Sequence, residues 1–205
     1  MVEVLCHSSI RIEEGNIVYI DPFQINKDYH DADYVFFTHS HYDHFSPKDI
    51  EKVKKEDTIF VVTEDLKEKA ETVFGKERIF VVKPGEKYEI QGLEFETTYA
   101  YNENKAFHPK QNQWVGYIIT INGKKYYIAG DTDNINEIQN IECDVALIPV
   151  GGTYTMDYQE AAQLANRIKA TVVIPTHYGS IVGKIEDGEN FKKLVTNKEV
   201  KILIN

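Results

Sequence analysis

A cluster of histidines stands directly after an apolar run near the start of this sequence. The run Tyr34-Val35-Phe36-Phe37-Thr38 is apolar on both parities until its last residue, which predicts a strand covered on both faces. Residues 39–44 then contain three of the chain's seven histidines. Ser46-Pro47 follows, with a capping hydroxyl and a proline suited to the first helical position. The histidines are therefore expected in a loop at the carboxyl end of a strand, where open sheets place their sites.

The side chains of this loop have the chemistry of metal ligands. In His39-Ser40-His41-Tyr42-Asp43-His44, the first two histidines are separated by one residue and can project to the same side of an extended loop. Asp43 and His44 then point elsewhere as the chain turns. Zinc, manganese and iron accept this mixture of imidazole and carboxylate. An incidental histidine-rich loop is the alternative, but the pattern after an apolar strand is hard to explain without a cation.

Two later strand ends repeat the arrangement. Tyr126-Tyr127-Ile128-Ala129 is followed by Gly130-Asp131, and Val173-Ile174-Pro175 is followed by Thr176-His177. Taken alone, Asp131 reads as a capping residue and His177 as a core residue. Their shared position at the end of an apolar strand favours a role beside the first loop.

Turn signals and apolar periodicity predict a fold of class α+β, with two mixed sheets covered by helices. Asn122-Gly123 predicts a type I′ hairpin between 115–121 and 125–129, and Gln91-Gly92 predicts another within 88–98. Helices are expected at 47–53, 64–74, 157–169 and 190–195, and further strands at 2–6, 17–20, 58–62, 79–82, 145–150, 172–174 and 201–204. A doubly wound single sheet is the competing architecture, but it would show fewer hairpins. At 205 residues, a single domain over 1–205 is expected.

The net charge and the number of cysteines exclude several classes of function for this chain. With 23 Lys and Arg against 33 Asp and Glu, the formal charge is −10, and the basic stripe of a non-specific nucleic-acid binder is lacking. Bound divalent cations would make an acidic pocket locally positive, so the negative net charge does not exclude an anionic substrate. Cys6 and Cys143 are too few and too far apart for a disulfide framework or zinc knuckle. We expect reduced cysteines, no membrane span and a cytoplasmic location.

Together these pieces resemble the metallo-β-lactamase superfamily. His39-x-His41-x-Asp43-His44, Gly130-Asp131-Thr132 and Pro175-Thr176-His177 stand in that family's order over essentially the whole chain. Cys6-His7-Ser8-Ser9 and Ile20-Asp21-Pro22 are similar to the opening of the branch of small metal-dependent hydrolases and ascorbate-phosphate-lactonase-like proteins. The motifs are specific for the superfamily and carry little information on a substrate.

The resemblance implies a four-layer αββα sandwich with a binuclear metal site. It assigns His39 and His41 to the first metal, Asp43, His44 and His177 to the second, and Asp131 to both as a bridge. Two divalent transition metal ions are expected, zinc first, with manganese, iron or nickel as alternatives. A hydroxide held between the metals would be the nucleophile, with Asp43 and Asp131 as the catalytic carboxylates.

The sequence departs from the family pattern at one ligand. The family usually has a further histidine at the end of a strand before the bridging aspartate. Here Asn102 stands at that position, and His108 follows six residues later. Either His108 is the missing ligand, or Asn102 binds weakly in its place, or the first metal site is incomplete.

Three further residues are expected to contact the substrate or to support the ligands. His7 stands at a strand end, where it packs against the site or lines it. Asp21 ends another strand and could hold a liganding histidine through the second ring nitrogen. Tyr178 could donate a hydrogen bond to a developing oxyanion.

A metal-dependent hydrolase of a small ester, lactone or phosphoester is the function expected. A di-iron-type oxidoreductase is the first alternative, although such relatives usually carry an electron-transfer domain. A non-catalytic or nucleic-acid-processing metalloprotein is the second, although nucleases of the superfamily usually carry an inserted domain. The expected partner is a small-molecule substrate, without membrane or nucleic acid, and association into a homo-oligomer is left open. The substrate assignment is by analogy, since a fold does not determine function.

Overall fold

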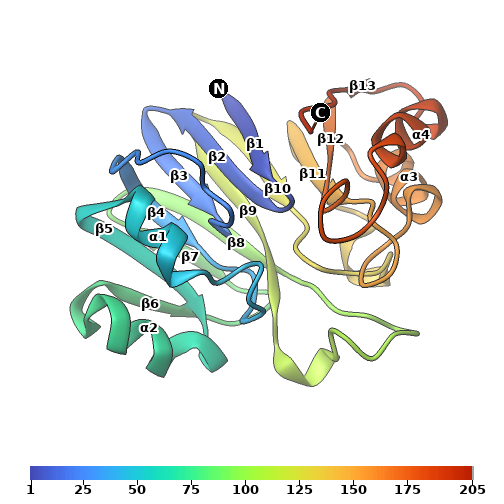
Figure 1. Ribbon diagram of the computed structural model, residues 1–205. Helices are drawn as coiled ribbons and strands as arrows, with labels where there is room; N and C mark the ends of the chain where they lie inside the picture. The colour runs from blue at the N-terminus through green and yellow to red at the C-terminus, as the bar shows by residue number, and fades with distance from the viewer. Residues whose placement is uncertain (205) are drawn as a thin grey trace. The chain divides into compact units, whose positions relative to one another are not determined.

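Two mixed β-sheets organise the chain, and each belongs to a unit of its own. The computed structural model describes residues 1–204. One unit spans Met1–Lys83 and holds the sheet β1–β6, and the other begins at Pro84 and holds the sheet β7–β13 (Figure 1). Each sheet starts as an antiparallel meander and continues as parallel strands.

The first sheet has its strands in sequence order. They are β1 (Val2–Cys6), β2 (Ser9–Glu14), β3 (Asn16–Ile20), β4 (Ala32–Phe36), β5 (Lys54–Thr63) and β6 (Ile79–Val82). β1 to β3 are antiparallel, and β3 to β6 are parallel. The carboxyl ends of β3 and β4 therefore lie at the same edge of this sheet, which brings the segments after Ile20 and Phe36 together.

Two helices cover one face of the first sheet. They are α1 (Pro47–Val53) and α2 (Lys67–Phe74), with a 3₁₀ turn before α2 (Glu64–Leu66) and another after it (Lys76–Arg78). Ile50 and Ala70 of these helices share one apolar cluster with Val35 and Phe60 of the strands. The Ser46 hydroxyl donates to Asp49 Oδ2 at 2.7 Å rather than accepting from the helix backbone.

The second sheet runs β13-β12-β11-β10-β9-β8-β7. Its strands are β7 (Lys87–Ile90), β8 (Leu93–Tyr99), β9 (Val115–Ile121), β10 (Lys124–Ile128), β11 (Val145–Pro149), β12 (Val172–Thr176) and β13 (Glu199–Val200). The β9–β10 turn has φ of 49° at Asn122 and 76° at Gly123, as the predicted type I′ turn requires. The parallel strands β10 and β12 direct their carboxyl ends to one edge.

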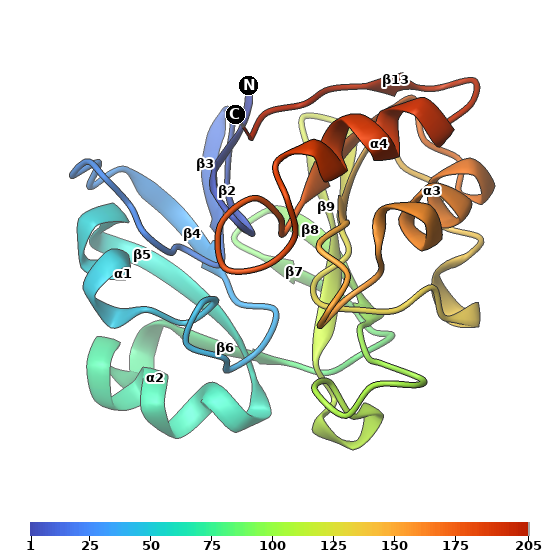
Figure 2. The same ribbon diagram turned by 45° about the vertical axis from the view of Figure 1, so that its right-hand side comes forward.

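Helices α3 (Tyr158–Arg167) and α4 (Glu186–Leu194) lie side by side on one face of the second sheet (Figures 1 and 2). Asp157 caps α3 in a capping box: its carboxylate accepts from Glu160 N, while the Glu160 side chain accepts from Asp157 N. Two 3₁₀ turns complete the unit, at Lys110–Asn112 and Asn136–Ile138.

The architecture confirms the predicted class of two mixed sheets with flanking helices and excludes a single doubly wound sheet for residues 1–204. Several element predictions were wrong. The strand Ser9–Glu14 was not predicted, because four of its six residues are polar. The predicted strand at 201–204 is not one, and the last strand is Glu199–Val200. The last helix begins at Glu186 rather than at 190. A single domain over 1–205 stays a prediction.

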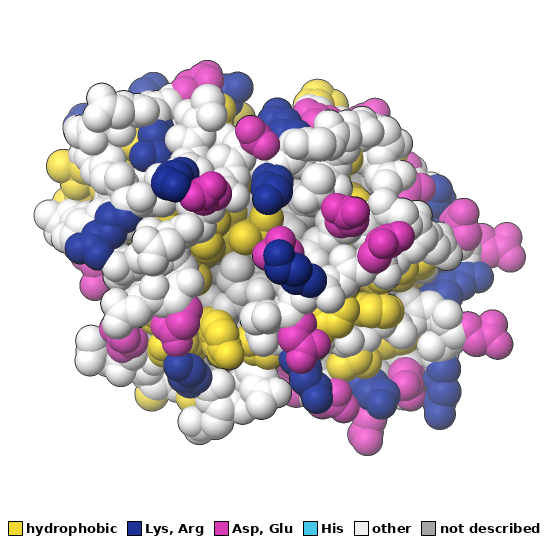
Figure 3. Space-filling model, turned by 180° about the vertical axis from the view of Figure 1, so that it is seen from behind, with side chains coloured by type: hydrophobic (Ala, Val, Ile, Leu, Met, Phe, Trp, Pro, Cys, Tyr) yellow, Lys and Arg dark blue, Asp and Glu magenta, His cyan; other side chains and the backbone are white. Residues whose placement is uncertain are grey.

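On the face shown in Figure 3, Lys and Arg side chains stand among Asp and Glu side chains rather than gathering into one patch. Within residues 1–204, every helix is too short or too polar to cross a lipid bilayer.

Gly151, just after β11, should be the least replaceable glycine near His177. A Cβ at residue 151 would lie 2.1 Å from the carbonyl oxygen of His177, a backbone atom that cannot rotate away. We expect Gly151→Ala to lower the free energy of unfolding by about 3 kcal/mol, as severe overpacking does. Urea denaturation measures this loss.

Gly152→Ala is the matched control. Residue 152 has a φ of 85°, but the nearest atom to its added Cβ is 3.7 Å away. It should therefore cost only about 1 kcal/mol for the left-handed backbone. An equal or smaller loss at residue 151 would contradict the role of close backbone packing there.

Candidate metal centre

The histidine loop of the first unit follows β4 and folds back on itself. The carbonyl oxygen of His41 accepts from His44 N at 3.0 Å and from Phe45 N at 2.8 Å, which closes a turn. His39 and His44 are buried, Asp43 is 9% exposed, and His41 is half-buried. The turn thus returns the second half of the motif toward the first.

The loop brings imidazole nitrogens and a carboxylate together with His7. Asp43 Oδ2 lies 3.3 Å from His7 Nε2 and 3.7 Å from His44 Nε2. His39 Nε2 lies 3.1 Å from His41 Nδ1. We call these five residues the N-terminal donor set. The sequence predicted four of them as ligands, and the structure adds His7 as a further nitrogen beside Asp43.

Asp21 determines which nitrogen of His44 carries the proton. Its fully buried carboxylate accepts from Thr38 N at 2.8 Å, from Thr38 Oγ1 at 2.6 Å and from His44 Nδ1 at 2.7 Å. Burial raises the pKa of Asp21, and the hydrogen bonds from His44 and Thr38 act in the opposite direction. Because Nδ1 of His44 donates to the carboxylate, Nε2 is the nitrogen available to a cation.

Thr38 orients His39 in the same way. Its hydroxyl donates its one proton to Asp21, so the oxygen must accept from His39 Nδ1, 2.9 Å away. Nε2 of His39 is then the nitrogen available to a cation. This role of Thr38 was not predicted, although a hydroxyl at the end of an apolar strand directly before a histidine motif is a usable signal.

The second unit gathers two buried histidines around one buried carboxylate, and we call these three residues the C-terminal donor set. Asp131 Oδ2 lies 3.1 Å from His177 Nε2 and 3.2 Å from His108 Nε2. Asp131 follows β10 and His177 follows β12, so the parallel pairing of this sheet explains their proximity. His108 comes from the loop between β8 and β9.

Asn102 contacts His108 and Asp133. Its Nδ2 donates to Asp133 Oδ1 and to Tyr154 O, both at 3.0 Å, and its Oδ1 accepts from His108. Lys105 Nζ also donates to Asp133 Oδ1, at 2.6 Å. Asp133 and Lys105 were not predicted, and their only signal is proximity in sequence to Asp131 and Asn102.

Tyr178 is buried in the apolar cluster beneath α3 and α4. Its hydroxyl donates to Ile204 O at 3.4 Å, and burial raises its pKa to about 12. This geometry directs the hydroxyl toward the C-terminal segment.

The chemistry of both donor sets fits a divalent transition metal. Imidazole nitrogens and carboxylate oxygens are the ligands that zinc, manganese and iron share. In each set a carboxylate oxygen lies about 3.1–3.3 Å from an imidazole nitrogen in a buried setting. A carboxylate and an imidazole lone pair at this distance repel each other unless a proton or a cation lies between them.

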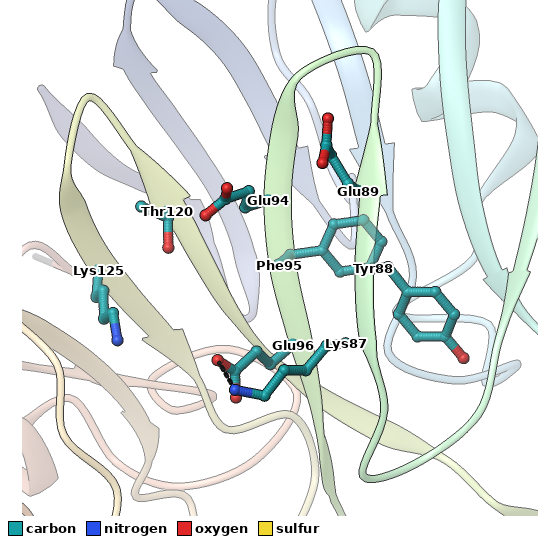
Figure 4. A pocket seen from close by; sticks show the side chains of 8 residues that line it. All are labelled: Lys87, Tyr88, Glu89, Glu94, Phe95, Glu96, Thr120 and Lys125. Atoms are coloured by element: carbon teal, nitrogen blue, oxygen red, sulfur yellow. Dashed lines mark ion pairs between the residues drawn. The ribbon is translucent and has the colours of Figure 1, made fainter.

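A separate pocket of about 420 Å³ lies on β7 to β10, and none of the predicted site residues lines it (Figure 4). An ion pair of 3.1 Å between Lys87 and Glu96 crosses it. Its lining residues are Lys87, Tyr88, Glu89, Glu94, Phe95, Glu96, Thr120 and Lys125. Its lining residues include carboxylates but no histidine, so it lacks the mixture of imidazole and carboxylate found in the donor sets.

Similarity to known proteins covers most of the chain. A model of the beta-lactamase superfamily domain matches residues 1–177. A UPF0173 metal-dependent hydrolase from Nanoarchaeum equitans is 32% identical over 211 residues, which cover 99% of this chain and 95% of that protein.

Solved structures agree with the observed architecture. A metallo hydrolase from the archaeon Ignicoccus hospitalis has a TM-score of 0.80 at 25% identity, covering 98% of this chain and 93% of that one. The metallo-beta-lactamase fold protein YhfI from Bacillus subtilis has a TM-score of 0.71 at 12% identity, covering 96% and 88%. The latter likeness concerns the fold alone.

Thr38→Val should test the hydrogen-bond network around Asp21. The variant keeps the shape of the side chain but leaves buried acceptors without the hydroxyl, so we expect the free energy of unfolding to fall by about 1–3 kcal/mol. Urea denaturation measures the change.

Thr72→Val is the control, because the Thr72 hydroxyl donates to Glu68 O on the exposed side of α2. It should stay within about 0.5 kcal/mol of wild type. A Thr38→Val protein as stable as this control would show that the hydroxyl contributes nothing to holding the loop.

Proposed function

Because the chain belongs to the beta-lactamase superfamily and, within it, to the UPF0173 family of metal-dependent hydrolases, we propose that it hydrolyses a small ester, lactone or phosphoester with two divalent metal ions. The membership confirms the superfamily resemblance and the metallo-β-lactamase class of fold. The number of ions, their identity and the substrate class are our proposal.

A single observation carries the proposal: each unit places a buried carboxylate and at least two imidazoles within ligand distance of one another at the ends of its strands. We propose that the N-terminal and C-terminal donor sets serve one binuclear centre. His39, His41 and His108 would hold the first ion, Asp43, His44 and His177 the second, and Asp131 both. Zinc is the ion we expect first.

The chain's own residues supply orientation and charge. Asp21 and Thr38 hold His44 and His39 with Nδ1 protonated, so each ring presents Nε2. The carboxylates Asp43 and Asp131 balance the positive charge of bound cations. When bound, two divalent cations lower the pKa of a water molecule and offset the negative charge that develops on the attacked group. These roles are those of a hydrolytic site.

The proposed substrate is a small molecule. The formal charge of −10 disfavours a polyanionic partner such as nucleic acid, and the curated relative is described as a hydrolase. We propose that the protein acts in the cytoplasm.

Metal content and reaction class can be measured together. Protein purified without chelator should contain one to two equivalents of transition metal by elemental analysis, and it should hydrolyse at least one member of a panel of lactones, phosphodiesters and thioesters. Chelation should abolish this turnover, and added zinc should restore it. A metal-free protein would contradict the proposal, and so would iron content with oxygen uptake in place of hydrolysis, which is the oxidoreductase outcome.

Asp131→Ala should remove turnover of any substrate found. Losing a partner of a metal ligand typically costs about 10- to 100-fold, so losing a bridging ligand should lower kcat/KM by more than about 100-fold. Circular dichroism checks that the fold persists. Asp28→Asn, a change at an exposed aspartate, should retain full activity, whereas turnover by the Asp131 variant would take that residue out of the bridging role.

A further inference from the structure

We propose that Asn102 is a positioning residue that fixes the tautomer of His108 and so directs Nε2 of that ring toward Asp131. The metal-binding part of this inference rests on the proposed function, whereas the tautomer itself is a property of the metal-free protein. The sequence left open whether Asn102 or His108 replaces a missing ligand. The geometry gives the two residues different roles.

The orientation of the Asn102 amide follows from its partners. Asp133 Oδ1 and Tyr154 O are both acceptors, so the group 3.0 Å from each of them must be the NH₂. The opposite atom is then Oδ1, which accepts from the backbone N–H of His108 at 3.0 Å. Asn102 is buried, and both ends of its amide are engaged.

The proton of His108 is placed by two acceptors. Nδ1 lies 3.0 Å from Asn102 Oδ1 and 3.2 Å from Tyr154 O. Neither oxygen can donate, so Nδ1 must carry the hydrogen. In the neutral ring Nε2 then holds the lone pair, and it lies 3.2 Å from Asp131 Oδ2. Asn102 thus acts on His108 as Asp21 acts on His44.

Asn102 also closes the loop that carries His108. The backbone N–H of Asn102 donates to His108 O at 2.8 Å, while the Asn102 side chain accepts from His108 N. The segment from 102 to 108 is therefore closed at its ends by one pair of residues. Lys105 anchors its middle, donating to Asp133 Oδ1 and to Thr155 O at 2.9 Å. This closure places His108 beside Asn102, the residue at which the loop begins.

Two substitutions separate positioning from simple loop stability. Asn102→Ala removes both the acceptor and the donor, whereas Asn102→Asp keeps an acceptor for His108 and loses the NH₂ donor to Asp133 and Tyr154. Lys105→Met is the matched control, because it removes a partner of Asp133 without touching the imidazole.

The readout is the ¹⁵N chemical shift of the His108 ring nitrogens in metal-free protein at pH 9, above the ordinary imidazole pKa of about 6.5, together with zinc affinity by chelator competition. We expect one tautomer, with Nδ1 protonated, in wild type, Asn102→Asp and Lys105→Met. Asn102→Ala should show a mixture of tautomers and a zinc affinity lower by about 10- to 100-fold.

A single Nδ1-protonated tautomer in Asn102→Ala, with zinc affinity unchanged, would overturn the inference. If Asn102→Ala does not fold, Asn102→Asp alone tests the inference. Loss of the single tautomer in Asn102→Asp would overturn it, because the NH₂ contacts, and not the acceptor oxygen, would then hold the His108 ring. A wild-type protein that binds no zinc but shows the tautomer mixture in Asn102→Ala would refute the proposed function and leave the positioning role intact.

Discussion

The histidine loop depends on the hydrogen bonds that Thr38 and His44 donate to the buried Asp21 carboxylate. A carboxylate removed from water is costly unless donors surround it. Two side chains and one backbone N–H supply those donors at 2.6–2.8 Å. Because His44 Nδ1 and the Thr38 hydroxyl donate to Asp21, the positions of their protons are defined. The Thr38 oxygen in turn accepts from His39 Nδ1, so His39 also has a defined tautomer. The loop is thus oriented by the need to satisfy one buried charge.

The second unit also holds a histidine ring through the nitrogen that faces away from the carboxylate. Asp131 is buried between His108 and His177, and Asn102 fixes the outer nitrogen of His108. Backbone strain accompanies these positions, since Asp21 and His177 adopt left-handed φ values of 48° and 58°. Such residues cost of order 1–3 kcal/mol and persist where the surrounding structure holds them, often at functional sites. In both units, therefore, the polar residues at strand ends are held in place by networks that local sequence preference would not favour.

Much of the fold and most of the candidate ligands could be predicted from local sequence signals. Apolar strands followed by His39, Asp131 and His177 indicated the candidate ligands, and Asn122-Gly123 indicated its hairpin. The strand Ser9–Glu14 was missed because most of its residues are polar. One of them, Arg11, is nevertheless buried, and its guanidinium donates to Tyr19 and Asp31. The roles of Thr38 and Asn102 were missed for a related reason: each depends on partners that only the folded chain brings together.

Our proposal for the metal centre is that the N-terminal and C-terminal donor sets together bind two cations. Anomalous scattering at the zinc edge from crystals of the zinc-loaded protein tests this most directly. We expect two peaks about 3.5–4 Å apart, with Asp131 contacting both and ligands drawn from each set. A single peak bound by one set alone, or no ordered zinc among these residues, would contradict it.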